Sequence, residues 1–168
     1  MSRDRDLQAS LEAATEPDVS GMGRALAQFL RAAGLPGAAE GEAPGKTAAA
    51  WAGSLIDGYG RDPADLLRPT WPDQAGQLVS ITGIPFVSVC EHHLLPFFGH
   101  VHVIYLPGGR LTGLSRVEEM VHALSHRLQL QERLGEEIVG TLHETVEARG
   151  AGCVIEAEHL CVFARGKR

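Results

Sequence analysis

The apolar pattern changes its period along the second half of the chain, and this change most constrains the fold. Residues 78–89 and 100–106 are rich in β-branched side chains and predict two neighbouring strands. Residues 115–146 carry apolar side chains at helical spacing, and residues 153–163 again read as a strand. The steadiest helical step, four residues, runs through Leu130, Leu134, Ile138, Leu142 and Val146. Strands and helices in this order predict an α+β fold, with two helices packed on an antiparallel sheet.

Local signals suggest where these elements begin and end. Ser115 and Glu118 have the spacing of a capping box, so we expect Ser115 to be the N-cap of the first of these helices. Pro85 favours an edge position or a bulge in the first strand. The ten residues CEHHLLPFFG, 90–99, then form a connection that is long for a hairpin and rich in titratable groups.

The first half of the chain predicts a separate helical region. Residues 1–19 are polar and lack periodicity, which predicts a flexible arm. Residues 20–75 form the expected N-terminal helical region, with helices over 22–33 and 46–58. Residues 76–168 form the expected α+β domain.

Composition narrows the class of protein. The net charge of −6 argues against a nucleic-acid or membrane-surface partner, because a basic excess supplies affinity for both. No apolar run reaches the roughly 18 residues of a membrane span, and the N-terminus does not resemble a signal peptide. Three cysteines are an odd number and too few for a disulfide framework. We therefore expect a cytoplasmic protein whose cysteines serve a metal or catalysis.

Cys90 and His93 have a C-x-x-H spacing that lets one turn aim both side chains at a single ion. A thiolate and an imidazole together favour zinc over magnesium or calcium. A buried free thiol beside a surface histidine would give the same pattern, so the pair alone is a weak signal.

A third ligand must come from Cys153 or Cys161. On an extended strand these residues lie about 26 Å apart, so both cannot reach one ion. His159 would share a strand face with Cys161, which favours Cys161 as the ligand and Cys153 as a core thiol. Three protein ligands leave a fourth position for water, as in catalytic zinc sites. His92 adjoins His93, but adjacent side chains usually point apart.

Four segments of the second half of the chain form a series: CEHHLLPFFGHVHVIYLP, LTGLSRVEEM, RLQLQERLGEEI and EHLCVFARG. In order and spacing they resemble the motif series of the GTP cyclohydrolase I family. The resemblance runs from about Ile84 to Gly166. A weaker similarity continues upstream in APGKTAAAW and GYGRDP.

The resemblance implies a tunnelling fold (T-fold), in which subunits associate side by side into a ring of antiparallel strands. It implies a homo-oligomer, commonly of ten subunits, with active sites between neighbours. The family's Zn²⁺ ligands fall on Cys90, His93 and Cys161. Its reaction opens the imidazole ring of GTP at C8, releases formate and yields 7,8-dihydroneopterin triphosphate.

Roles for further residues follow from the same resemblance. His159 would protonate the purine N7, and His92 would carry a second proton. Glu132 would accept hydrogen bonds from the guanine N1 and amino group, with Gln131 beside it. The expected contacts to ribose and phosphates are Ser115, which also counts as a catalytic candidate, Arg116, Arg165 and Lys46.

Each of these residues also has an ordinary structural explanation. Ser115 can do no more than cap its helix, and a Gln-Glu pair on a helix is commonly a solvated face. A histidine between apolar strand residues, such as His159, is commonly a satisfied core residue.

Two positions depart from the family pattern. Glu119 stands where the family typically has an arginine contacting the triphosphate, and Lys46 stands where another phosphate-side arginine is typical. An acid near a polyanion replaces attraction with repulsion. One alternative is therefore a related purine or nucleotide cyclohydrolase whose substrate has fewer phosphates or none. Another is a zinc-containing ring protein that binds purines or pterins without turnover, although a binder needs neither His159 nor an open zinc position.

Overall fold

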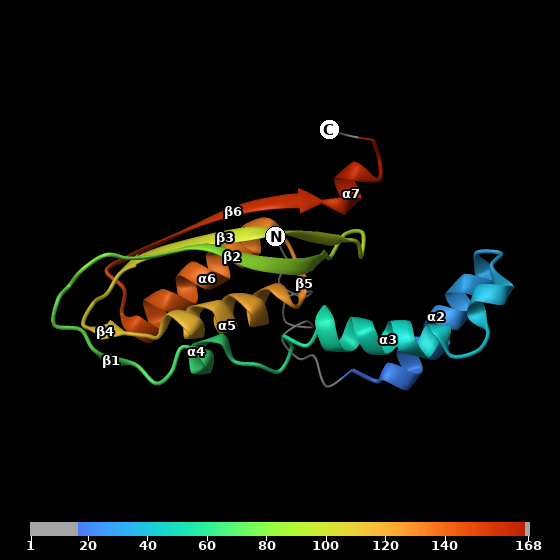
Figure 1. Ribbon diagram of the computed structural model, residues 1–168, viewed down its shortest axis with the longest axis horizontal. Helices are drawn as coiled ribbons and strands as arrows, with labels where there is room; N and C mark the ends of the chain where they lie inside the picture. The colour runs from blue at the N-terminus through green and yellow to red at the C-terminus, as the bar shows by residue number, and fades with distance from the viewer. Residues whose placement is uncertain (1–16, 167–168) are drawn as a thin grey trace, which may run out of the picture. The chain divides into compact units, whose positions relative to one another are not determined.

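The computed structural model describes residues 17–166 and divides the chain into two compact units between Gly60 and Arg61. This division falls earlier than the sequence boundary at residue 75, because a short helix, α4 (Pro63–Leu66), packs against the helices of the second unit. Most of the expected N-terminal arm, residues 1–16, lies outside the described residues. Figure 1 shows the elements of both units.

The first unit consists of helix α2 (Val19–Ala32), a 3-10 turn η1 (Pro36–Ala39) and helix α3 (Ala43–Ser54). Asp18 caps α2, since its carboxylate accepts a hydrogen bond from the Gly21 N–H at 2.9 Å. Helix α3 begins three residues before the predicted start, because Pro44 suits the first turn of a helix. The predicted pair of helices is confirmed, with boundaries shifted toward the N-terminus.

The second unit is built on a four-stranded sheet with the order β5-β2-β3-β6. The long strands are β2 (Val79–Cys90), β3 (Pro96–Leu106) and β6 (Gly150–His159), and they pair antiparallel. The two-residue strand β5 (Leu128–Gln129) pairs parallel with the end of β2. A separate two-stranded sheet joins β1 (Trp71–Pro72) to β4 (Arg110–Leu111). One helical turn, α7 (Leu160–Phe163), follows β6.

Helices α5 (Leu114–Ser125) and α6 (Gln131–Val146) cover one face of the four-stranded sheet (Figure 1). The predicted four-residue step is confirmed from Leu134 onward, since Leu134, Ile138, Leu142 and Val146 are all fully buried. Its first predicted member, Leu130, is instead the half-buried N-cap of α6. From the sheet, Phe97, Val101, Val103 and Tyr105 point into the same core. The α+β prediction, with two helices packed on the sheet, is therefore confirmed.

Among the described residues of the second unit, no helix lies over the opposite face of the sheet. Phe98, Ile104 and Val154 lie on this face and are 40%, 41% and 60% exposed. Strand β2 carries a bulge between Ile81 and Ile84, where Gly83 adopts a φ of 75°, just before Pro85. The bulge that Pro85 suggested is thus present.

Three predicted boundaries are wrong. Gly113, not Ser115, is the N-cap of α5, and no side chain caps this helix, so Ser115 and Glu118 do not form a capping box. The last strand ends at His159 rather than 163, because its ladder with β3 stops at the pair of Phe97 and His159 and the chain then turns into α7. The hairpin connection is also shorter than expected, since β3 begins four residues before His100.

None of the helices in residues 17–166 has the length and apolar character that crossing a membrane requires.

Candidate metal centre

Cys90, His93 and Cys161 come together at one end of the sheet, although Cys161 lies 68 positions after His93 in the sequence. One ligand atom from each residue lies within 4.8 Å of the other two. Both cysteines are buried, while His93 is exposed. A bound ion would therefore be held from the protein side by sulfur and remain reachable from solvent.

The turn after β2 explains how Cys90 and His93 converge. The Cys90 carbonyl accepts hydrogen bonds from the N–H groups of His93 at 3.3 Å and Leu94 at 2.8 Å. The Cys90 N–H donates to the Leu95 carbonyl at 2.9 Å, which closes the turn. Leu94 takes a left-handed φ of 54°, a conformation that a branched residue adopts only under constraint. The turn folds His93 back over Cys90.

The geometry fits tetrahedral zinc. The Cys90 Sγ lies 3.5 Å from the His93 Nδ1. Zinc bonds of about 2.3 Å to sulfur and 2.0–2.1 Å to nitrogen put two tetrahedral ligands about 3.5 Å apart. Two sulfurs and one imidazole are also donors that zinc prefers. The three residues could thus hold a zinc ion and leave one coordination position open.

The electrostatics of the cluster favour a cation. Burial raises the pKa of the Cys161 thiol, and the neighbouring Cys90 sulfur raises it further, whereas Arg165 lowers it. Two buried thiols this close resist ionising together because their charges repel. A bound cation removes that repulsion and stabilises both thiolates.

His159 and Gln131 form a second group beside the cluster. The His159 Nε2 lies 2.8 Å from the Gln131 Oε1, and the Gln131 Nε2 donates to the Ile155 carbonyl at 3.0 Å. The His159 ring stacks on Phe97, with centroids 4.8 Å apart and planes 5° from parallel. Cys161 lies on α7 and not on the strand face of His159, so the predicted shared strand face is wrong even though both residues reach this end of the sheet.

A partly buried ion pair next to the metal cluster was not predicted. Arg133 on α6 pairs with Glu91, the residue after Cys90, and their side chains are 17% and 10% exposed. Glu91 is further held by its N–H, which donates to the Gln129 carbonyl at 3.2 Å. The pair ties the ligand turn to α6. Nothing in the sequence indicates that Glu91 and Arg133, 42 positions apart, form an ion pair.

Glu132 lies at the mouth of a groove of about 410 Å³ between α6 and β6. Gln131, Cys153 and Ile155 also line this groove. Cys153 packs against the core but is only partly buried, and burial raises the pKa of its thiol to about 11. It is therefore less of a core residue than the sequence suggested, and it lies outside the metal cluster.

Two further predicted site residues also lie at the metal end of the sheet. The Arg165 Nε donates to the Cys161 carbonyl at 2.9 Å, so this exposed arginine stays near the cluster. The rings of His92 and His93 have centroids 6.0 Å apart and are 81° from parallel. His92 Nε2 is 4.0 Å from Glu91, so His92 is not a ligand in this arrangement.

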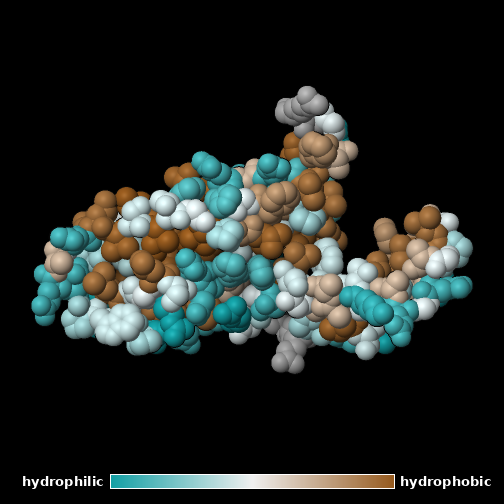
Figure 2. Space-filling model, viewed as in Figure 1, coloured by the Kyte–Doolittle hydropathy of each residue, from teal (hydrophilic) through white to brown (hydrophobic). Residues whose placement is uncertain are grey.

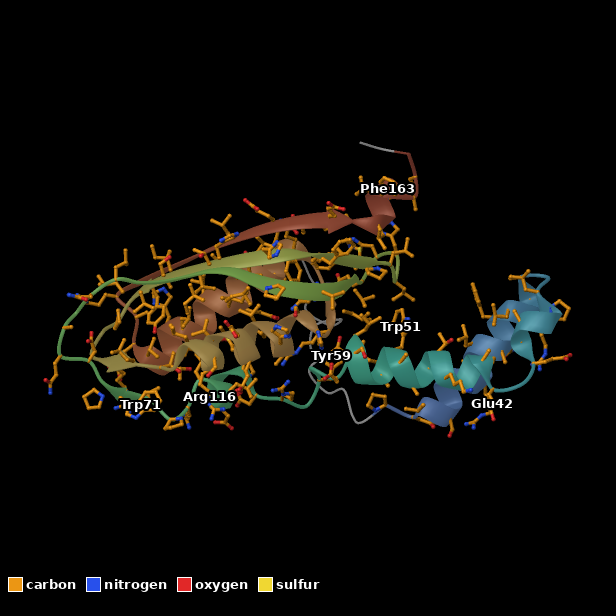
Figure 3. All side chains as sticks on the ribbon, viewed as in Figure 1. Glu42, Trp51, Tyr59, Trp71, Arg116 and Phe163 are labelled. Carbon is orange, nitrogen blue, oxygen red and sulfur yellow. The ribbon has the colours of Figure 1, made fainter. Side chains whose placement is uncertain are left out.

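Two of the residues predicted to contact ribose and phosphates, Ser115 and Arg116, do not join Arg165 at the metal end within one chain. Ser115 and Arg116 lie at the start of α5, whereas the end of α5 leads into β5 and the metal end (Figure 3). Twelve helical residues span about 18 Å. Lys46 belongs to the first unit, where it pairs with Glu42 at 2.7 Å.

Comparisons with known proteins find one family. Residues 22–168 match the sequence profile of GTP cyclohydrolase I. The chain is 44% identical over 160 residues to GTP cyclohydrolase 1 of Chromobacterium violaceum, which covers 93% of the chain and 77% of the relative. It is 46% identical over 113 residues to GTP cyclohydrolase 1 of Campylobacter lari, covering 67% of the chain and 60% of the relative. For the Bacteroides thetaiotaomicron enzyme of the same name, identity is 44% over 114 residues, with 67% and 58% covered.

Proposed function

The chain belongs to the GTP cyclohydrolase I family of T-fold hydrolases, and from that premise we propose that it is a zinc-dependent cyclohydrolase. It opens the imidazole ring of a guanine nucleotide at C8 and releases formate. The first substrate proposed is GTP, with 7,8-dihydroneopterin triphosphate as the product. The observation that carries the proposal is the Cys90, His93 and Cys161 cluster, with His159 two residues before Cys161 in the chain.

The chemistry supplied by zinc, when bound, is Lewis acidity that lowers the pKa of water toward about 7. The chain's own part at the metal is to hold the three donors in place. Burial of both thiols and the closed turn at Cys90 serve that purpose.

His159 moves a proton to the purine N7 in this proposal, which makes C8 a better electrophile. Phe97 stacks on the His159 ring, and Gln131 makes a hydrogen bond with its Nε2. His92 is exposed and free to exchange protons with solvent, which suits a second proton carrier for the later steps.

Glu132 reads the base in this proposal. Its carboxylate is exposed at the groove beside Gln131 and makes no side-chain hydrogen bond within residues 17–166. A carboxylate can accept from both the N1–H and the amino group of guanine, whereas adenine would leave it unpaired.

A second candidate is a cyclohydrolase for a guanine compound with fewer phosphates. The observation that favours it is the ion pair between Arg116 and Glu119, whose side chains lie 3.0 Å apart. Glu119 offsets the positive charge that Arg116 would present to a phosphate. Arg165 and Lys46 remain as cations for the substrate, and Lys46 is itself paired with an acid.

The proposed active form is a ring in which neighbouring chains complete each site. Support comes from Arg116, which lies at the other end of α5 from the metal cluster of its own chain. The strand β6 is an open edge of the sheet, and such an edge can pair with another chain. Apolar side chains also gather around α7 on the surface (Figure 2), where Leu160, Val162 and Phe163 are 37%, 41% and 76% exposed.

The function is tested by incubating zinc-loaded protein with GTP, GMP, guanosine and guanine and measuring formate. Release from GTP above all others supports the first candidate, and release from GMP or guanosine at least as fast supports the second. Binding without formate from any of the four would refute both and leave a purine- or pterin-binding protein. His159→Ala is the matched variant, and it should retain zinc while losing about 10² to 10⁴ in turnover.

A further inference from the structure

The orientation of the Gln131 amide is set by the backbone. The Ile155 carbonyl oxygen can only accept a hydrogen bond, so the group that faces it at 3.0 Å must be the amide nitrogen of Gln131. The amide oxygen is then left to face the His159 Nε2 at 2.8 Å. Rotating the amide by half a turn would put two oxygens against each other, so the usual ambiguity of glutamine side chains does not arise here.

This orientation fixes the hydrogen on the imidazole. An amide oxygen has no hydrogen to donate, so the His159 Nε2 must carry one and donate it to Gln131. A neutral His159 then has its lone pair on Nδ1. Within the described residues Nδ1 has no hydrogen-bond partner, which leaves it as the nitrogen that exchanges a proton with a ligand.

We propose that Gln131 is a positioning residue that holds His159 in the Nε2–H tautomer, and that it does not read the substrate base. The inference rests on the proposed function, in which His159 moves a proton. Both ends of the Gln131 amide are already committed to the chain's own atoms. The neighbouring Glu132 is exposed at the groove and free to take the base.

The stacking on Phe97 restricts the tilt of the His159 ring. Phe97 is 1% exposed and pairs with His159 across the ladder of β3 and β6. Stacking keeps the ring parallel to Phe97 but permits rotation within that plane or a ring flip. The hydrogen bond to Gln131 selects one of these orientations, so Phe97 and Gln131 restrict different motions of the same ring.

The test compares Gln131→Met, which keeps the length and loses both hydrogen bonds, with Gln131→Glu, which keeps the acceptor for His159. Magic-angle-spinning NMR of zinc-loaded, ¹⁵N-histidine-labelled protein reports the tautomer, and His159→Gln identifies the signal. We expect Nε2–H in the wild type and in Gln131→Glu, and a shift toward Nδ1–H or a mixture in Gln131→Met. With the substrate found to release formate, Gln131→Met should lose roughly 10-fold to 100-fold in kcat at nearly unchanged KM, as is usual for an outer hydrogen bond to a functional histidine. Gln131→Glu should recover part of that loss.

Two results would overturn the inference. One is an Nδ1–H tautomer in the wild type, or a tautomer that Gln131→Met leaves unchanged. The other is a rise in KM with kcat unchanged, which would make Gln131 a base-reading residue. The tautomer is measured without substrate, so it decides the role of Gln131 even if no guanine compound releases formate. A lack of formate release from every compound would refute the proposed function and leave the tautomer result standing. Zinc content and circular dichroism of both variants confirm that each has folded.

Discussion

The guanidinium Nη1 of Arg116 lies 3.0 Å from the Glu119 Oε2, one turn further along α5. The two side chains are 41% and 44% exposed, so the pair adds at most about 1 kcal/mol to stability. Its consequence is electrostatic. The cation closest to the start of α5 is already partly neutralised by the chain itself, and a phosphate would have to compete with Glu119 for it.

Replacing Glu119 with Arg should raise kcat/KM for GTP by about tenfold and leave kcat/KM for guanosine unchanged, because a new charge-assisted contact helps only a ligand that reaches it. Steady-state kinetics on both compounds measure the change. Glu118→Arg is the matched control, since Glu118 is exposed on the same turn and makes no ion pair with Arg116. Equal effects on GTP and guanosine, or equal effects of the two variants, would place Glu119 outside the phosphate site.

Cys153 should react slowly with iodoacetamide at neutral pH. A raised pKa of about 11 means that the thiolate forms only in alkaline solution, so at pH 8 its population is about a hundredfold below that of a thiol with a pKa of 9. The labelling rate should therefore climb about tenfold per pH unit up to about pH 11. Mass spectrometry of the Cys153 peptide follows the rate, with Cys153→Ser as the blank. A rate that is already level at pH 8 would show an ordinary, solvated thiol.

Arg133→Met should lower the free energy of unfolding by about 3 kcal/mol, because it leaves the Glu91 carboxylate buried without its partner. Urea unfolding of the zinc-loaded protein, with every variant at the same protein concentration, measures the loss of stability. The double variant Glu91→Gln with Arg133→Met should regain much of it, since no charge then remains buried. If the double variant is as unstable as Arg133→Met, packing of the arginine stem rather than the charge is what matters.

The sequence is sufficient to predict those parts of the fold that depend on local pattern. The four-residue apolar step predicts α6, because the helical positions of the step, Leu134, Ile138, Leu142 and Val146, share one helix face and are all buried. The C-x-x-H spacing likewise finds Cys90 and His93, because a single turn holds both. Cys161 is the third member of the cluster, but it lies on α7, beyond the end of the strand predicted to carry it.

The remaining features depend on contacts between residues far apart in sequence. The end of β6 coincides with the last pair of its ladder with β3, Phe97 with His159, which the composition of residues 153–163 does not reveal. Gln131 meets His159 across 28 positions, and Arg133 meets Glu91 across 42. The start of α5 differs from the prediction by two residues, because a backbone group of Gly113, not the Ser115 side chain, begins the helix.

The central claim is that Cys90, His93 and Cys161 hold a zinc ion on which ring opening depends. Its most direct test is to measure zinc per chain after dialysis, together with formate release from guanine compounds, in the wild type and in Cys161→Ser and Cys153→Ser. We predict one zinc per chain and formate release in the wild type and in Cys153→Ser, and the loss of both in Cys161→Ser. Formate release from Cys161→Ser without zinc, or loss of zinc from Cys153→Ser, would contradict the account.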